Sequence, residues 1–361
     1  MLPTSNLPPW LSKSQSPAYQ TSLQRTLQQR ENIRSTLRSL HLQKLQPPKE
    51  IPRHLFDFYS IAEACHPHNR KQNRYSDIAP YDRTIVSVGT DSQPRYLNAS
   101  WCLERSGRKW WIASQAPLPA SAHSFLSLIR QPISLPASAS STVPNSAPQS
   151  TRVRTVVQLT MLVEGGRTKA HSYFPAVVGQ SDVHYPEPSC SEAALRATLL
   201  EQVELPDACC IKSKVSISLM GDDDHHVTFQ HLLYTAWPDH GVPEPKDQVA
   251  LMNFLRLVDS TNRVNSQDPD PPMIVGCSAG VGRTGTFIAV SSLFRAHGFL
   301  PPAISPSVLS LSSPLGPLPP AFDTDLVAQE VDSLREQRPS MVQRPAQLEL
   351  VYSLLEAAFV Q

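Results

Sequence analysis

The chain has 361 residues and a formal net charge of +1 at neutral pH, with 40% hydrophobic and 17% charged residues. This length suits one large domain or two ordinary ones with a sizeable core, and the near-neutral charge excludes a protein that binds nucleic acid through bulk electrostatics. Proline is the outlier, because its 35 residues are near twice the typical share of about 5%.

The start of the chain and its cysteines bear on location. The first twenty residues lack the apolar core of a secretory signal, and no stretch approaches the roughly 18 apolar residues of a membrane span. The cysteines are irregularly spaced, which predicts reduced thiols rather than a disulfide framework. We therefore expect a cytoplasmic protein, with the nucleus as the alternative, that neither spans a membrane nor binds nucleic acid.

The first predicted element lies in an N-terminal extension over residues 1–50. The leucine spacing of Thr21–Leu45 predicts a helix, which Pro47 and Pro48 end. The remaining residues, 51–361, are assigned to one domain. Its first predicted elements are a short amphipathic helix at His54–Cys65, strands within Arg95–Ser114 with Trp110–Ile112 the strongest, and a helix at Ser121–Ile129.

Two segments rich in proline and serine, near 131–150 and 299–322, are predicted to be insertions. The other predicted elements are a buried strand at Val153–Leu162, a hairpin of Lys212–Met220 and His226–Tyr234, and helices at Gln248–Val258, Thr284–Arg295, Asp325–Gln337 and Pro345–Phe359. Helices and strands alternate, so we expect an α/β fold with a twisted mixed, largely parallel sheet and helices on both faces.

The most informative segment is Met273–Gly285. An apolar run ends at Cys277, five small residues follow, and Arg283 precedes an apolar helix. Successive inward amides form an anion nest, and the helix N-terminus adds its dipole to the same point. Both favour the thiolate, the reactive form of cysteine. Arg283 offers a planar fork for two phosphate oxygens, and the hydroxyl of Thr284 is placed to donate to the sulfur. This pattern predicts a phosphate-ester hydrolase with a cysteine nucleophile.

The spacing from cysteine to arginine is not specific by itself. It recurs at Cys102 with Arg108 and at Cys190 with Arg196, where the glycines, the preceding strand and the following helix are absent. The alternative for Cys277 is a buried structural cysteine beside a glycine-rich connection. The context of Cys277 therefore carries the hypothesis.

A second segment, Trp237–Pro243, offers a proton donor for the leaving alcohol. Asp239 lies between a stiff Trp-Pro entry and a Gly/Pro exit, as a loop that closes over a site requires. The alternative is an ordinary turn with an Asx cap.

Together these segments resemble the protein tyrosine phosphatases, in particular the phosphotyrosine-specific, non-receptor branch. The resemblance runs from about residue 54 to the end. Five further segments carry it: Asn73–Ile78 with Pro80–Asp82, Tyr96–Ser100, Gln115–Pro119, Glu164 with Lys169 ahead of Tyr173–Pro175, and Arg338–Gln343 with Gln347. It implies a tyrosine-phosphatase-like fold, phosphotyrosine-containing proteins as partners in signal transduction, and neither metal nor cofactor.

The resemblance also implies roles for individual residues. Cys277 attacks phosphorus, Asp239 protonates the tyrosyl oxygen and then activates a water that Gln343 places, and Arg283 and Thr284 complete the catalytic set. Tyr75 stacks on the substrate ring and Asp77 holds its backbone. The remaining substrate-binding residues are Ser278, Ala279, Gly280, Val281, Gly282, Gln347, Lys169 and Glu164.

The sequence departs from the family pattern beside the nucleophile. Gly276 stands where the family usually has histidine, and Arg344-Pro345 stands where it usually has a threonine and an acidic residue. Two alternatives to an active tyrosine phosphatase stay open. One, suggested by Gly276, is a catalytically impaired protein that binds phosphotyrosine. The other is a dual-specificity or lipid phosphatase, which Tyr75 and its loop disfavour.

Overall fold

The computed structural model describes residues 7–90, 93–136, 150–188, 190–238, 241–264 and 268–360. Its helices are α1 (Pro9–Ser14), α2 (Pro17–Leu42), α3 (Arg53–Phe58), α4 (Ala62–Cys65), α5 (Pro67–Arg70), α6 (Ala122–Arg130), α7 (Gln248–Asn262), α8 (Gly282–Ala296), α9 (Leu326–Gln337) and α10 (Pro345–Val360). Its strands are β1 (Val88–Thr90), β2 (Gln93–Arg95), β3 (Ala99–Leu103), β4 (Trp110–Gln115), β5 (Ile133–Ser134), β6 (Ser150–Thr151), β7 (Thr155–Gln158), β8 (Val163–Glu164), β9 (Arg167–Thr168), β10 (Ser181–His184), β11 (Leu195–Leu205), β12 (Cys210–Leu219), β13 (Asp222–Tyr234) and β14 (Met273–Cys277).

One large sheet organises the fold, with strands in the order β10-β11-β12-β13-β7-β14-β4-β3. The expected mixed sheet is confirmed, but it is less parallel than the sequence indicated. Among the described strands of this sheet, only the central pairings β13–β7, β7–β14 and β14–β4 are parallel, and the four outer pairings are antiparallel. Short connections join β11, β12 and β13, and such connections can only link antiparallel strands.

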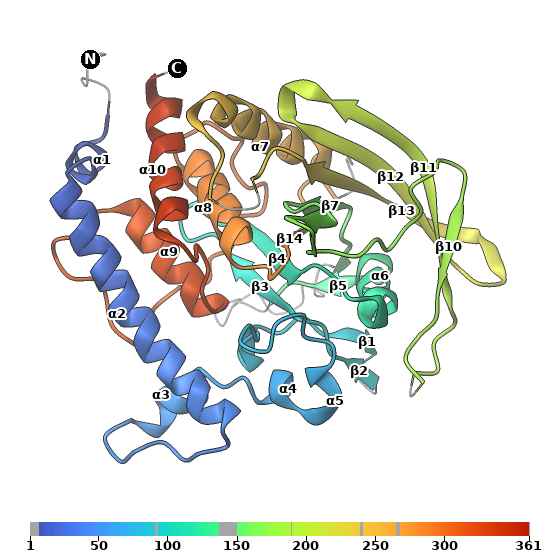
Figure 1. The fold of residues 1–361 in the computed structure, drawn as a ribbon, viewed down its shortest axis with the longest axis horizontal. Coiled ribbons are helices and arrows are strands. Elements are labelled where there is room, and N and C mark those ends of the chain that lie inside the picture. The colour runs from blue at the N-terminus through green and yellow to red at the C-terminus, as the bar shows by residue number, and fades with distance from the viewer. Residues whose placement is uncertain are drawn as a thin grey trace.

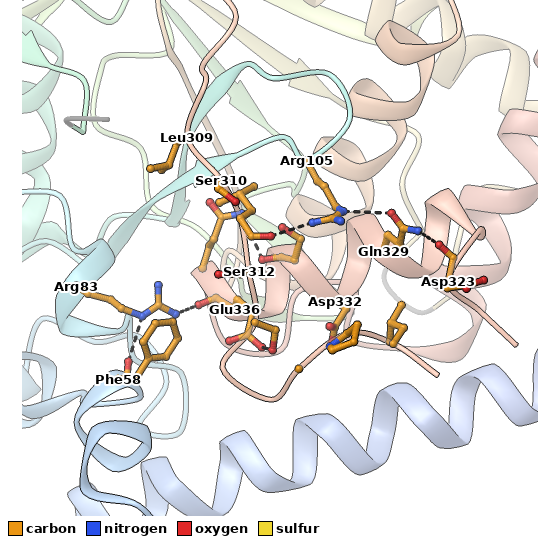
Figure 2. A pocket seen from close by; sticks show the side chains of 17 residues that line it. Phe58, Arg83, Arg105, Leu309, Ser310, Ser312, Asp323, Gln329, Asp332 and Glu336 are labelled. Carbon is orange, nitrogen blue, oxygen red and sulfur yellow. Dashed lines mark hydrogen bonds between the residues drawn. The ribbon is translucent and has the colours of Figure 1, made fainter. Parts of the chain in front are cut away.

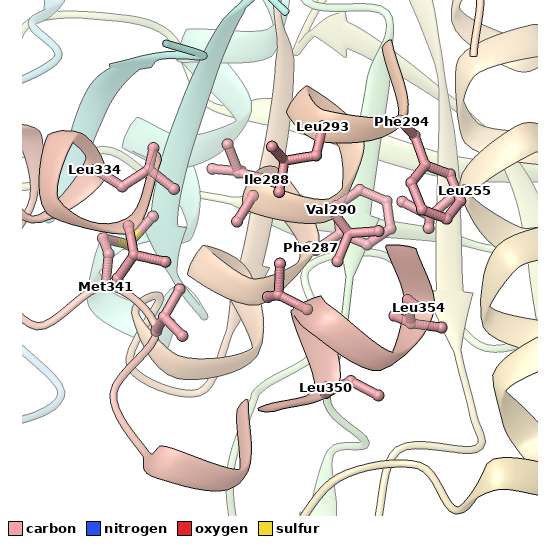
Figure 3. Packing of buried hydrophobic residues seen from close by; sticks show 14 of the residues in the cluster. Leu255, Phe287, Ile288, Val290, Leu293, Phe294, Leu334, Met341, Leu350 and Leu354 are labelled. Carbon is pink, nitrogen blue, oxygen red and sulfur yellow. The ribbon is translucent and has the colours of Figure 1, made fainter. Parts of the chain in front are cut away.

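Helices cover both faces of this sheet (Figure 1). On the central strand β14, Met273 and Val275 belong to the core under α7–α10, and Ile274 belongs to the core on the α6 side. Figure 3 shows the first of these cores, where Phe287 and Ile288 of α8 meet leucines of the neighbouring helices. A strand buried on both faces needs apolar residues throughout, which is the pattern of a central parallel strand.

The N-terminal helices are part of this packing. Helix α2 runs along the outside of α9 (Figure 1), and its Leu23 and Leu27 are buried in the core under α7–α10. Buried ion pairs join the same two helices: Arg30 to Asp332 at 2.8 Å, and Arg34 to Asp332 and Glu336 at 2.6 and 2.5 Å. The predicted helix Thr21–Leu45 is thus confirmed, with an earlier start and an end at Leu42.

Two local predictions were wrong or incomplete. The segment predicted as one helix, His54–Cys65, forms α3 and α4 with a break between them. The carboxylate of Asp82 causes the restart, because it accepts hydrogen bonds from the amides of Ala62 and Glu63, both at 3.0 Å. Strand β11 was not predicted. The insertion near 131–150 lies mostly outside the described residues, and no described helix is long and apolar enough to cross a membrane.

Candidate active site

Cys277 lies at the carboxyl end of β14, which pairs with parallel strands on both sides. Helix α8 begins at Gly282, so the loop between them connects a strand end to a helix N-terminus. The cysteine is buried, with 6% of its surface exposed. In open α/β sheets, ligands bind outside the carboxyl ends of the strands, and this position is therefore the expected one for a site.

The loop is held open by contacts on its outside. The buried guanidinium of Arg338 donates to the carbonyl of Gly280 at 2.8 Å and to that of Ala279 at 3.1 Å. A trans peptide points its N–H away from its carbonyl, so the next amides in the chain point to the inside. The amides of residues 278–282 donate no hydrogen bond to any residue in the described ranges. A ring of such amides is a nest for an anion.

Arg283 follows this loop and is fixed by a bidentate ion pair. Its guanidinium donates to the two carboxylate oxygens of Glu164 at 2.6 and 2.9 Å. Burial alone raises the pKa of Glu164, but the hydrogen bonds and charge of Arg283 outweigh it and hold that pKa below its usual value. Arg283 also donates to the carbonyl of Pro238 at 2.9 Å. The predicted proton donor Asp239 follows directly but lies outside the described residues.

The segment Asn73–Ile78, which carries Tyr75, lies beside the loop that follows Cys277. The hydroxyl groups of Tyr75 and Ser278 are 2.8 Å apart, and Ser278 donates to the carbonyl of Lys169 at 2.7 Å. Arg74 anchors its segment by donating to the carbonyls of Ala116 and Pro117. Tyr75 is 37% exposed and Asp77 is exposed. Ser278 therefore contacts both Tyr75 and Lys169, and the exposed Asp77 follows Tyr75 by two residues.

Thr284, on the first turn of α8, and the segment with Gln343 and Gln347 also adjoin the loop that follows Cys277. The hydroxyl of Thr284 is fully buried and has no hydrogen-bond partner among the described residues. The amide of Val342 donates to the carbonyl of Val281 at 3.3 Å, which brings the exposed Gln343 next to the loop. Gln347 accepts from the amide of Arg344 at 3.1 Å and packs against Gly282, where an added Cβ would lie 2.8 Å from its side chain.

The glycine before the nucleophile occupies a tight position. A Cβ at Gly276 would lie 2.8 Å from the carbonyl oxygen of Ser114 on the neighbouring strand. A small cavity of about 20 Å³ lies next to it, with Gln158 and Tyr173 in its lining. A histidine at this position therefore requires the strands to move apart slightly.

Sequence reasoning missed several of these positioning groups. Arg338 lies in the segment Arg338–Gln343, which resembles the family, but the sequence predicted no role for it. The sequence predicted no role for Ser114 or Gln158 either. Each acts through contacts with segments far away in the chain, so no local pattern marked them. The pairing of Glu164 with Arg283 was equally invisible, because 119 positions separate the two residues.

Gly280→Ala is expected to destabilise the protein strongly. A Cβ there would lie 2.2 Å from the carbonyl oxygen of Ser114, and the backbone has φ +71°. We expect a loss of roughly 3 kcal/mol or more of unfolding free energy, measured by urea denaturation. Gly179→Ala is the matched control, because that glycine has φ +87° and open space around it. Equal losses in the two variants would refute the close contact.

A pH dependence is expected from His231, which lies on β13 beside Gln158. Burial lowers the pKa of His231 to about 4, and its ring donates to Gln158 at 3.2 Å. An unfolded histidine titrates near 6.5, so the unfolded state binds more protons between pH 6.5 and 4 and stability falls as pH falls through that window. Relative to His231→Gln, the wild type should lose about 3 kcal/mol between these pH values. A constant difference between the two unfolding free energies would contradict this assignment.

Comparison with known proteins gives a consistent result. A family model described as protein-tyrosine phosphatase matches residues 69–133 and 149–297. The chain is 34% identical to receptor-type tyrosine-protein phosphatase eta of Mus musculus over 227 residues, which are 62% of this chain and 15% of that protein. It is 32% identical to phosphatidylinositol phosphatase PTPRQ of Homo sapiens over 247 residues, or 68% of this chain and 9% of that one.

A shorter relative is covered more fully. Tyrosine-protein phosphatase non-receptor type 20 of Rattus norvegicus is 29% identical over 288 residues, which are 79% of this chain and 56% of that protein. The matched segment thus spans less than two thirds of each of these relatives.

Proposed function

This chain belongs to the protein tyrosine phosphatase family, and from that premise we propose that it hydrolyses protein phosphotyrosine in two steps through a phosphocysteine. The observation that supports the proposal is the loop between Cys277 and Arg283, whose amides at residues 278–282 have no described partner, with Arg283 fixed by Glu164. Amides and a guanidinium held in place before the reaction stabilise charge on a transferring phosphoryl group.

In the first step the thiolate of Cys277 attacks phosphorus and the bond to the tyrosyl oxygen breaks. Asp239 gives its proton to that oxygen, so tyrosine leaves neutral and the enzyme carries a phosphocysteine. Arg283 holds two of the phosphoryl oxygens. The carbonyl of Pro238, which accepts from Arg283, ties the loop that carries Asp239 to the phosphate cradle.

In the second step a water attacks the phosphocysteine. Gln343 places the water, and the carboxylate of Asp239 takes one of its protons as the bond between phosphorus and sulfur breaks. Phosphate leaves and the thiolate returns. The buried hydroxyl of Thr284, which has no described partner, is the proposed donor to the departing sulfur.

Substrate recognition is assigned to the rim of the loop. The amides of Ser278, Ala279, Gly280, Val281 and Gly282 bind the phosphoryl oxygens. Tyr75, whose hydroxyl meets Ser278, packs against the substrate ring, and Asp77 holds the peptide backbone. Glu164, Lys169 and Gln347 keep the surrounding loops in place. Partners are phosphotyrosine-containing proteins in the cytoplasm, with the nucleus as the alternative, where such thiols stay reduced.

Two alternatives follow from particular observations. Gly276 leaves the nucleophile without its usual neighbour, which favours a weakly active phosphotyrosine-binding protein. Similarity to a phosphatidylinositol phosphatase favours a lipid substrate.

One assay separates these proposals. Phosphate release is measured from a phosphotyrosine peptide, the matching phosphoserine peptide and a short-chain phosphatidylinositol phosphate. We expect kcat/KM for phosphotyrosine to exceed the other two by roughly 10²-fold or more, since a ring that fills the pocket gains apolar contacts that shorter groups lack. Equal rates for all three substrates contradict the proposed specificity. Tight peptide binding without phosphate release supports the binding protein.

A further inference from the structure

A second pocket lies on the outer side of α9, lined by that helix and by residues within 309–318, in the segment predicted to be an insertion (Figure 2). Its volume is about 610 Å³. Pockets of roughly 300–1,000 Å³ are the size that holds small ligands. The lining includes none of the residues assigned above to catalysis or substrate binding. We call it the α9 pocket.

The two ends of the α9 pocket each carry an arginine. Arg105 donates to the side chain of Gln329 at 3.3 Å and to the carbonyl of Leu311 at 2.9 Å. Arg83 donates to the carbonyls of Phe58 and Glu336, and its guanidinium stacks on the Phe58 ring at 3.8 Å. Neither arginine forms an ion pair with any carboxylate in the described part of the chain. Arg83 is exposed, so its guanidinium is open to an anion from solvent.

The two carboxylates that α9 contributes to the wall are paired with arginines of α2. Asp332 is paired with Arg30 and Arg34, and Glu336 is paired with Arg34 and accepts from Tyr59 and Ser313. Their charges are thus already balanced by α2. The other charged groups of the lining are the guanidinium groups of Arg83 and Arg105 and the carboxylate of the exposed Asp323.

The spacing of the two arginines indicates an elongated ligand. Arg105 contacts Gln329 and Arg83 contacts Glu336, positions that lie about 10 Å apart along the axis of α9. The pocket also has apolar lining in Leu309, Leu311 and Leu318. An extended chain gains about 1.2 Å per backbone atom, so about ten atoms cover that distance.

We propose that the α9 pocket binds an elongated dianion with an apolar middle, of the class of α,ω-dicarboxylates. One carboxylate binds Arg83 and the other binds Arg105, while the methylene chain lies against the leucines of residues 309–318. The pocket is separate from the proposed phosphatase site, so its occupation can be tested by binding alone.

The test uses three probes on the intact chain: decanedioate, decanoate and 1,10-decanediol, with calorimetric titration as the readout. We expect decanedioate to bind roughly tenfold more tightly than decanoate, and decanoate more tightly than the diol, because each carboxylate adds a charged hydrogen bond. In Arg83→Met and Arg105→Met the advantage of decanedioate over decanoate should disappear. Arg53→Met is the matched control, because Arg53 is exposed on α3, pairs with Asp57 and is not part of the pocket lining.

Two further measurements keep the test decisive if an arginine variant unfolds. Hydrogen exchange of the wild type with decanedioate should show protection in 309–318 and α9, and Ser312→Trp, at an exposed lining position, should block all three probes. Protection over 277–283 instead would place the ligand in the phosphate cradle and overturn the proposal. Equal affinity for decanedioate and the diol, or no binding of any probe at millimolar concentration, would also overturn it.

Discussion

Cys277→Ser should abolish phosphate release, lowering kcat by roughly 10⁴-fold or more while the protein stays folded. A serine hydroxyl in the same cradle is not ionised at neutral pH, so it does not attack phosphorus as a thiolate does. The exchange of one atom in a buried side chain leaves the strand β14 and helix α8 in place. Release is measured from a phosphotyrosine peptide, and folding by thermal denaturation.

Cys102→Ser is the matched control for this variant. Cys102 has the same spacing to an arginine and is completely buried, and burial raises its pKa to about 12. It therefore stays a thiol at neutral pH and should be dispensable for turnover. Loss of activity in a folded Cys102→Ser variant, or residual activity in Cys277→Ser, would reassign the nucleophile.

Arg283→Lys should lower kcat by about 10²- to 10³-fold with a smaller change in KM. A lysine keeps the positive charge but has no planar fork, so it does not hold Glu164 and two phosphoryl oxygens in one plane. The variant loses stabilisation of the transition state, in which the guanidinium would bind two charged phosphoryl oxygens. The effect is measured as kcat and KM separately, with vanadate inhibition as a second readout.

Arg167→Lys is the control for the arginine exchange. Arg167 is exposed on β9, in the hairpin that carries Glu164, and it lies in no proposed contact with the substrate. Its exchange should change kcat less than twofold. If Arg283→Lys behaves like this control, the guanidinium fork is not required, and the proposed cradle has the wrong cation.

Local sequence patterns predicted most of the fold because they depend on residues close in the chain. The helices α6, α7, α8, α9 and α10 and the hairpin of β12 with β13 lie close to their predicted positions. The break between α3 and α4 was not predictable in this way, because the cap of α4 comes from Asp82, on another segment. The edge position and length of β11 depend likewise on its pairing with β12.

The same distinction between neighbouring and distant residues applies to the candidate site. The glycines, the cysteine and the arginine of the loop are close together in the chain, so the sequence predicted that they form one site. The groups that hold the loop are not adjacent: Arg338 lies 58 positions from Gly280, whose carbonyl it binds. Hydrogen bonds between residues so far apart in the chain depend on the tertiary structure, so no short stretch of sequence predicts them.

The contact of α2 with α9 has a consequence for the smallest stable fragment. The family match begins at residue 69, but a fragment cut there would lose Arg30 and Arg34 and leave Asp332 and Glu336 without cations. Arg335, which binds the carbonyls of Met341 and Val342 beside Gln343, would also lose its bond to the carbonyl of Leu27. The segment matched by the family model is therefore shorter than the segment whose side chains pair in the core, and we expect a fragment that begins at residue 69 to be less stable than the full chain.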